Sequence, residues 1–96
     1  MKELSIEKIR DKAFSTVKSL IGKEPETVIS IEKTDQGWKA KIEALERKAV
    51  PDTQDILARY ELLFKENGEL LGWNQVMVRK RGDRIYPKEE EWVLSP

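Results

Sequence analysis

Two segments that alternate apolar and polar residues, joined by Asn67-Gly68, constrain the fold of this chain more than any other feature. The first covers residues 56–65 and places one set of side chains on a single face, namely Ile56, Ala58, Tyr60, Leu62 and Phe64. Residues 70–80 form the second segment. Asn-Gly is a strong hairpin signal, because a type I′ turn requires positive φ at both central residues. We therefore predict a β-hairpin with strands at 56–65 and 70–80.

A two-residue turn at Asn67-Gly68 also fixes which residues of the two strands face each other. The predicted pairs on one face are Phe64 with Leu71, Leu62 with Trp73, Tyr60 with Gln75, and Ala58 with Met77. The mostly apolar faces of both strands then coincide, as a half-buried sheet requires. The other face pairs Glu61 with Asn74 and Arg59 with Val76, so we expect it to be largely solvated.

The first part of the chain has the spacing of an amphipathic helix over residues 5–22. Its apolar stripe consists of Ile6, Ile9, Ala13, Phe14, Val17, Leu20 and Ile21. Ser5 suits the N-cap, and Gly22 suits the left-handed position that follows a helix. Two further strands are predicted at 27–33 and 38–46, from β-branched residues in the first and alternation in the second.

Together these elements predict a single α+β domain over residues 1–86. One N-terminal amphipathic helix packs on a four-stranded antiparallel sheet, because the apolar face of the sheet needs a cover. Leu45 interrupts the alternation of the second strand, which indicates a bulge or the end of that strand. Residues 87–96 are predicted to be a polar C-terminal tail.

Composition excludes several classes of function. The 96 residues include 18 Lys and Arg and 18 Asp and Glu, so zero net charge gives no general attraction to nucleic acid or anionic membrane. Cysteine and histidine are absent, which removes the usual thiolate and imidazole ligands and the commonest proton shuttle. We find no membrane-spanning run and no signal peptide pattern, so we expect a cytoplasmic protein without cofactor or metal.

The corner between the second and third predicted strands, Pro51-Asp52-Thr53-Gln54-Asp55, admits three interpretations. Two carboxylates three residues apart suit a catalytic pair or a cation site, but a calcium loop needs more oxygen ligands and a shaped glycine turn. A polar surface loop also does not separate the pKa values of two acids. We favour a structural turn, in which Pro51 fixes φ and Asp52 and Asp55 accept backbone N–H groups.

The segment after the fourth predicted strand is basic from Arg79 to Arg84. Nucleic-acid binding by such a loop calls for aromatic side chains to stack on bases, and only Tyr86 lies close in sequence. The acidic residues 89–91 oppose phosphate, so we favour a solvated basic loop beside an acidic tail. The final Trp92-Val93-Leu94 either docks on the domain or anchors a partner, and the sequence leaves both open.

The stretch GW-x-A-x-IE-x-x-ERKAVPDTQDILARYEL-x-x-x-x-NGELLGW resembles the gas vesicle protein O (GvpO) family. The resemblance covers about residues 37 to 80. It rests on Trp38, Glu43, Glu46, Pro51, Asp52, Thr53, Asp55, Leu57, Tyr60, Glu61, Gly68, Leu70 and Trp73. The family often has an arginine- and tyrosine-rich strand after the hairpin, whereas residues 74–78 are uncharged here.

The resemblance implies an accessory protein of gas vesicle assembly or its regulation, not an enzyme, which acts by protein–protein binding. Its implied partners are other gas vesicle proteins, namely the major shell protein and the ATPase encoded in the same cluster, and its place is the cytoplasm or the vesicle. A homodimer is left open. The candidate partner-binding residues are Pro51, Asp52, Asp55, Arg59, Glu61 and Trp92. The alternative is a nucleic-acid-binding regulator that uses Arg79–Arg84.

Overall fold

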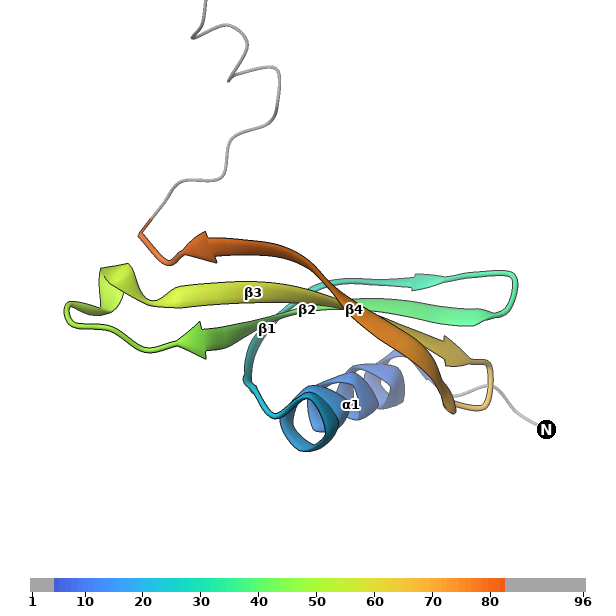
Figure 1. Ribbon diagram of the computed structural model, residues 1–96. Helices are drawn as coiled ribbons and strands as arrows, with labels where there is room; N and C mark the ends of the chain where they lie inside the picture. The colour runs from blue at the N-terminus through green and yellow to red at the C-terminus, as the bar shows by residue number, and fades with distance from the viewer. Residues whose placement is uncertain (1–4, 83–96) are drawn as a thin grey trace, which may run out of the picture.

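The computed structural model describes residues 5–82 as one helical segment and one antiparallel sheet (Figure 1). Helix α1 (Ile6–Thr16) continues into a π-helical turn, η1 (Val17–Ile21), and a short 3₁₀ helix, η2 (Asp52–Gln54), precedes the third strand. The strands are β1 (Glu24–Lys33), β2 (Gly37–Arg47), β3 (Ile56–Lys65) and β4 (Leu70–Lys80), hydrogen-bonded in the order β1-β2-β3-β4. The predicted α+β fold is confirmed. The predicted tail, residues 87–96, and the last predicted residues of the domain lie outside the described part.

The helical segment begins and ends at the predicted residues. The Ser5 hydroxyl accepts a hydrogen bond from the Lys8 amide at 3.3 Å, and Gly22 takes a left-handed conformation with φ of 82°. The Gly22 amide donates to the Val17 carbonyl at 2.9 Å, which closes the final turn. Its π-helical character from Val17 to Ile21 was not predicted by the apolar spacing.

The core lies between α1 and one face of the sheet. Ile9, Ala13 and Val17 of the helical segment are completely buried. They pack with the sheet residues Ala40, Ile42, Ala44, Ala58, Tyr60, Leu62 and Phe64. Figure 1 shows α1 beneath this face, where it contacts β1 and β2. The stripe and the sheet face that the sequence predicted to meet therefore do meet.

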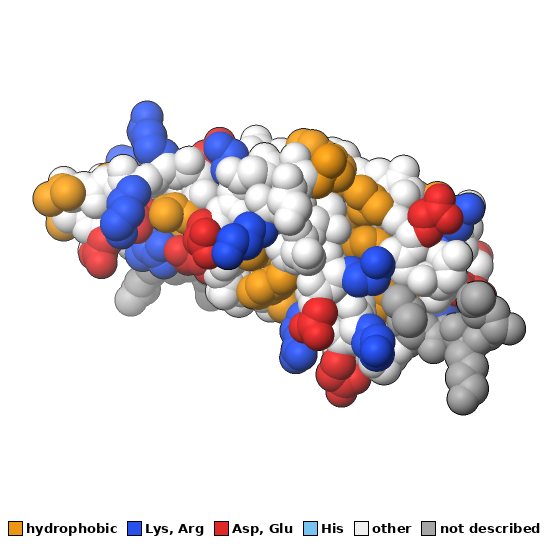
Figure 2. Space-filling view, turned by 90° about the horizontal axis from the view of Figure 1, so that it is seen from below, with side chains coloured by type: hydrophobic (Ala, Val, Ile, Leu, Met, Phe, Trp, Pro, Cys, Tyr) orange, Lys and Arg blue, Asp and Glu red, His pale blue; other side chains and the backbone are white. Residues whose placement is uncertain are grey.

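Cover of this face is incomplete. α1 packs mainly on β1 and β2, and of β4 Leu70 packs against the buried cluster while residues 73–78 stay exposed. Figure 2, seen from the side of α1, shows apolar side chains exposed in the middle of the surface among charges of both signs. Within residues 5–82 no helix lies over the opposite face of the sheet, which we call the open face.

The boundaries of two strands differ from the predicted ones, and β2 is one residue longer at each end. β1 begins at Glu24, three residues earlier than predicted, and includes Pro25. Proline is tolerated there because β1 is an edge strand, where the missing N–H need not face a neighbour. β2 extends to Arg47, and its pairing with β3 shifts between Leu45 and Arg47. This irregularity confirms the bulge indicated by Leu45.

The predicted register of the β3–β4 hairpin is correct at its centre and wrong at its ends. The pairs Leu62–Trp73, Glu61–Asn74 and Tyr60–Gln75 are confirmed. The predicted partners of three β3 residues are wrong, since the structure pairs Phe64 with Leu70, Arg59 with Met77, and Ala58 with Val78.

The turn explains the errors. The Gly68 amide donates to the Lys65 carbonyl at 2.8 Å, and the Lys65 amide donates to the Glu69 carbonyl at 2.8 Å. Gly68 has φ of 93°, while no non-glycine residue among residues 5–82 has positive φ, so Asn67 does not adopt the predicted type I′ conformation. The loop is a type I turn followed by a left-handed glycine, one residue longer than expected. A bulge at Leu71 restores the register and a second at Val76 shifts it again.

A substitution at Gly37 tests how closely the start of β2 approaches the end of β3. A Cβ atom there would overlap the Phe64 carbonyl oxygen. We expect Gly37→Ala to lower the free energy of unfolding by about 2–3 kcal/mol, because backbone must move to relieve the overlap. Gly72→Ala is the matched control, since a Cβ at Gly72 meets nothing within 4 Å. Urea unfolding measures both variants, and equal stability of the two would contradict the close approach.

Candidate interaction surface

The open face carries two of the four charged candidate residues, Arg59 and Glu61. Alternation along the strands and the observed register assign one set of side chains to it, consisting of Lys39, Lys41, Glu43, Leu45, Leu57, Arg59, Glu61, Leu63, Gly72, Asn74, Met77 and Arg79. Arg59 lies opposite Glu43, and Glu61 lies between Lys41 of β2 and Asn74 of β4. Charged residues of both signs therefore share one side of the sheet.

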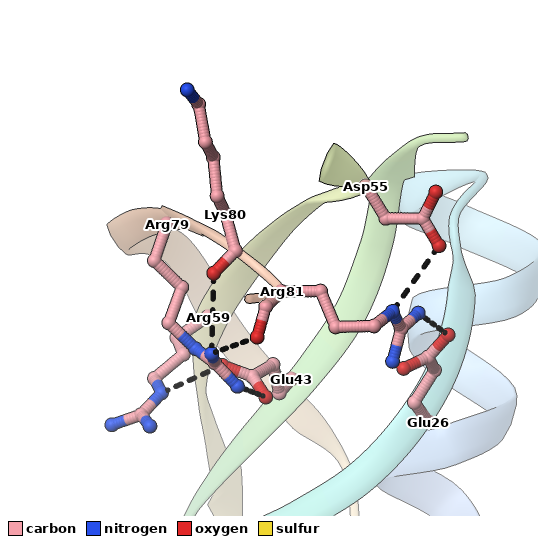
Figure 3. A network of polar contacts seen from close by, with 7 residues as sticks. All are labelled: Glu26, Glu43, Asp55, Arg59, Arg79, Lys80 and Arg81. Carbon is pink, nitrogen blue, oxygen red and sulfur yellow. Dashed lines mark hydrogen bonds and ion pairs between the residues drawn. The ribbon is translucent and has the colours of Figure 1, made fainter. Parts of the chain in front are cut away.

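Glu43 organises the polar contacts of the open face, as Figure 3 shows. Its side chain is only 6% exposed and receives a bidentate pair of hydrogen bonds from Arg79, Nε to Oε2 and Nη2 to Oε1, each 2.8 Å long. Arg59 Nε donates to Oε2 at 3.1 Å. Arg79, and secondarily Arg59, lower the pKa of Glu43 against the opposing effect of burial. One ionised carboxylate thus joins β2, β3 and β4.

A second ionic cluster closes the corner before β3. The Asp55 carboxylate is 1% exposed, accepts the Ala49 amide at 2.7 Å, and pairs with Arg81 Nε at 3.2 Å. Arg81 Nη2 reaches Glu26 of β1 at 2.8 Å (Figure 3). The Ala49 amide, and then Arg81, lower the pKa of Asp55, while Glu26 and Asp55 raise the pKa of Arg81. The corner is therefore held by charge as well as by turn geometry.

Backbone contacts attach the end of β4 to the same corner. The Arg81 amide donates to the Asp55 carbonyl and the Gly82 amide to the Thr53 carbonyl, both at 2.8 Å. Arg79 Nη1 also donates to the carbonyls of Lys80 and Arg81 at 3.4 Å. The start of the segment expected to be a solvated basic loop is thus anchored through Arg81 and Gly82.

Five of the six sequence-predicted candidates fall into three groups, and the sixth, Asp55, is buried at the corner. Pro51 and Asp52 are exposed at the corner. Arg59 and Glu61 lie on the open face, partly buried. Trp92 lies outside the described residues.

Asp55 differs from what the sequence indicated. We expected a solvated loop carboxylate that caps nearby amides, but Asp55 is buried and accepts the amide of Ala49, six residues earlier. Its carboxylate holds the scaffold, so contact with a partner would require the corner to open.

Sequence reasoning missed four members of the two clusters: Glu26, Glu43, Arg79 and Arg81. The opposite charges of Glu43 and Arg59 would have indicated a cross-strand pair once the β2–β3 register was known. The contact between Arg81 and Glu26 spans 55 residues and leaves no local signal. Its existence depends on how β4 ends at the corner.

The carboxyl groups with shifted pKa values are poorly suited to acid catalysis near neutral pH. A catalytic acid needs a raised pKa near neutrality, whereas the shifts of Glu43, Glu46 and Asp55 are all downward. The pKa of Glu46 is lowered mainly by the Tyr60 hydroxyl, which donates a hydrogen bond to its carboxylate at 2.8 Å. Burial and the same contact with Glu46 raise the pKa of Tyr60. Within residues 5–82 no three His, Cys, Asp or Glu side chains are grouped to hold a metal. Nor is any described helix long and apolar enough to cross a membrane.

Comparison with known proteins points to gas vesicles. The family described as "Gas vesicle synthesis protein GvpO" matches residues 1–84. Gas vesicle protein O1 of Halobacterium salinarum is 38% identical over 72 residues, which cover 75% of this chain and 60% of that protein. Gas vesicle protein O of a Streptomyces species is 41% identical over 70 residues, covering 73% and 55%. Gas vesicle protein O of Haloferax mediterranei is 40% identical over 73 residues, covering 75% and 52%.

The aligned part of this chain therefore spans between about half and three fifths of each relative. No solved structure matches the chain.

Replacing Glu43 tests the first cluster. Glu43→Gln removes the negative charge between Arg59 and Arg79 at a site that is 6% exposed. We expect the free energy of unfolding to fall by about 2–3 kcal/mol, less than for a fully buried pair because both arginines remain partly exposed. Glu61→Gln, half-buried on the same face, is the control and should change stability by less than about 0.5 kcal/mol. Equal effects in urea unfolding would refute the special role of Glu43.

Stability should depend on acid pH and not on pH near neutrality. Lowered pKa values mean that the folded state binds fewer protons than the unfolded chain, so the stabilisation is complete above the ordinary values of 4.5 for Glu and 3.8 for Asp. It is lost as the pH falls through the lowered values. Without histidine, the free energy of unfolding should be flat from about pH 6 to about pH 8. Denaturation at a series of pH values measures this, and Glu43→Gln should show a shallower acid loss.

Proposed function

This chain belongs to the GvpO family of gas vesicle synthesis proteins, and we propose that it acts in gas vesicle formation as an accessory protein that binds other proteins. The family resemblance seen in the sequence is confirmed by the match to residues 1–84. The matched relatives carry gas vesicle names, and this chain aligns with only part of each. The mode of action is therefore argued from the structure.

The observation that carries the proposal is the open face with its fixed charges. The paired arginines and Glu43 hold the strands in place, while Lys39, Lys41 and Glu61 remain partly accessible beside them. A rigid surface with interspersed charges gives orientation and specificity to protein association more than raw affinity. Pro51 and Asp52 extend this candidate surface at the exposed corner.

The proposed partners are other gas vesicle proteins, in particular the major shell protein and the ATPase encoded in the same gene cluster. The proposed place of action is the cytoplasm, in contact with the growing vesicle. The family description names synthesis of gas vesicles and no chemical reaction. Together with the lowered carboxyl pKa values, this supports a non-enzymatic role.

The nucleic-acid alternative has weaker support. It relies on Arg79 to Arg84, but Arg79 pairs with Glu43, and Arg81 pairs with Asp55 and Glu26. Charges that are neutralised within the domain release fewer counterions from a phosphate backbone. Binding of the purified chain to DNA or RNA that is strong at low salt and falls steeply with added salt would revive this alternative.

Charge reversal at the accessible acids tests partner binding. We expect the wild-type chain to bind the shell protein or the ATPase, and the double variant Asp52→Lys/Glu61→Lys to bind about tenfold more weakly or worse, because it opposes the charge pattern of the surface. Asp35→Lys is the control. Asp35 is an exposed acid in the turn between β1 and β2, at the opposite end of β2 from Asp52. Titration with each purified partner measures affinity. Failure of both proteins to bind the wild-type chain would refute the proposal.

A further inference from the structure

β4 combines two properties that an edge strand of a monomer normally avoids. Residues 70–78 form nine consecutive positions without charge, the longest such run in a chain that is 38% charged. β4 is also a terminal strand of the sheet, so one side of its backbone has no neighbouring strand within residues 5–82. Monomeric proteins protect long edges with charge, proline or a covering element, because a bare edge accepts another strand.

The side chains of β4 are as open as its backbone. Every residue from 73 to 78 is exposed, including Trp73 at 44% and Val78 at 51%. α1 packs mainly on β1 and β2, and it leaves these side chains exposed. Tyr60 meets the Trp73 ring edge-on at 5.9 Å between centroids, so the indole stands in a defined orientation at the surface.

The opposite edge of the sheet is protected in the usual way. β1 contains Pro25 and has Glu24 and Glu26 at one end and Glu32 and Lys33 at the other, whereas pairing irregularities occur in both edge strands, two in each. The proline and the charges discourage pairing with a further strand. The two edges of one sheet therefore differ, and only β4 is suited to accept a strand.

We propose that β4 pairs antiparallel with β4 of a second copy of this chain, with Asn74 at the two-fold axis. Charge at the strand ends favours this partner and direction. Glu69, exposed and paired with Lys65 of its own chain at 3.5 Å, precedes β4. The exposed Lys80 ends the strand, while Arg79 is bound to Glu43. An antiparallel pair places the acidic end of one copy beside the basic end of the other, to within the one-residue shifts of the bulges. The Lys80 side chain extends away from the polar network and is exposed (Figure 3).

Side-chain direction restricts the register further. Directly opposite residues of an antiparallel pair share a face, so pairing must match open-face residues with open-face residues. Asn74 opposite Asn74 satisfies this condition, and it sets Trp73 of each copy opposite Gln75 of the other, on the α1 side. The two tryptophans then lie diagonally across the axis, within reach of each other.

A second copy also accounts for closure. The two-fold pair forms one eight-stranded sheet whose remaining edges are both β1, the protected edge. An isologous contact uses up the exposed strand in both partners and stops at a dimer. A strand from a different protein would cover β4 equally well, but the sequence of this chain does not determine the charges on such a strand.

Opposite charges at position 74 provide a sharp test with the full chain. We expect the wild type to be a dimer by light scattering during size exclusion at about 100 µM, where a micromolar Kd is saturated. Asn74→Lys and Asn74→Asp should each raise the Kd about tenfold or more, because like charges meet at the axis. Mixing the two variants should restore the dimer. Thr27→Lys, exposed on β1, is the control and should leave the dimer unchanged.

Cross-linking gives a second readout that does not depend on added charge. The chain has no cysteine, so Asn74→Cys introduces the only thiol. Residues facing each other across an antiparallel pair have Cα atoms about 4.5–5.5 Å apart, within the range of a disulfide. Oxidation should give a covalent dimer with Asn74→Cys and none with Thr27→Cys. A monomeric wild type, loss of the dimer in Thr27→Lys, or variants whose mixture stays monomeric would each overturn the proposal.

Discussion

One helical segment has to cover a four-stranded sheet, and it is too small to do so. The segment from Ile6 to Ile21 buries one stripe, centred on Ile9, Ala13 and Val17, against β1, β2 and the near side of β3. Burial of apolar surface is the main favourable contribution to folding, so the covered half of one face supplies most of the core. The open face and β4 must be stabilised by other means. This limitation accounts for the polar clusters on one side and the exposed strand at the edge.

On the open face, ionic contacts take the place of a second layer. Glu43 accepts hydrogen bonds from Arg79 of β4 and Arg59 of β3, so one carboxylate ties three strands without apolar cover. Arginine stems also shield apolar neighbours. Leu57 shows the result, since it lies opposite Leu45 and Arg79 on the open face and is still only 1% exposed. Such clusters add little stability beyond what an apolar pair would give, but breaking them is costly.

Features fixed by neighbouring residues could be predicted from the sequence. The limits of β3 and β4 are as predicted, because alternation and Asn67-Gly68 are local signals. The exact turn could not be predicted, since a type I turn with a left-handed glycine and the predicted type I′ turn both accept Asn-Gly. The bulges at Leu71 and Val76 left no signal that we recognised, and they decide which residues meet at both ends of the hairpin.

The candidate site was less predictable because its contacts are long-range. A turn at residues 51–55 was predicted, and Asp55 accepts a backbone amide there as expected, but its burial follows from Arg81, which approaches only after β4 has crossed the sheet. The same residue reaches Glu26 on the opposite edge strand. A single-sequence reading recognises charges without knowing their partners, so it took the basic segment for a solvated loop.

The two unusual regions of the sheet follow from one distribution of charge. Arg79 and Arg81 turn inward to Glu43 and Asp55, which fixes the end of β4 against the corner and places that strand firmly at the edge. The preceding residues, 70–78, contain no charge with which to protect that edge. β4 is thus held rigidly, carries no charge over residues 70–78 and is flanked by an acid and bases. Such a strand is well prepared to bind another strand, because it loses little conformational entropy on binding. The charges that build the corner therefore also prepare β4 for association.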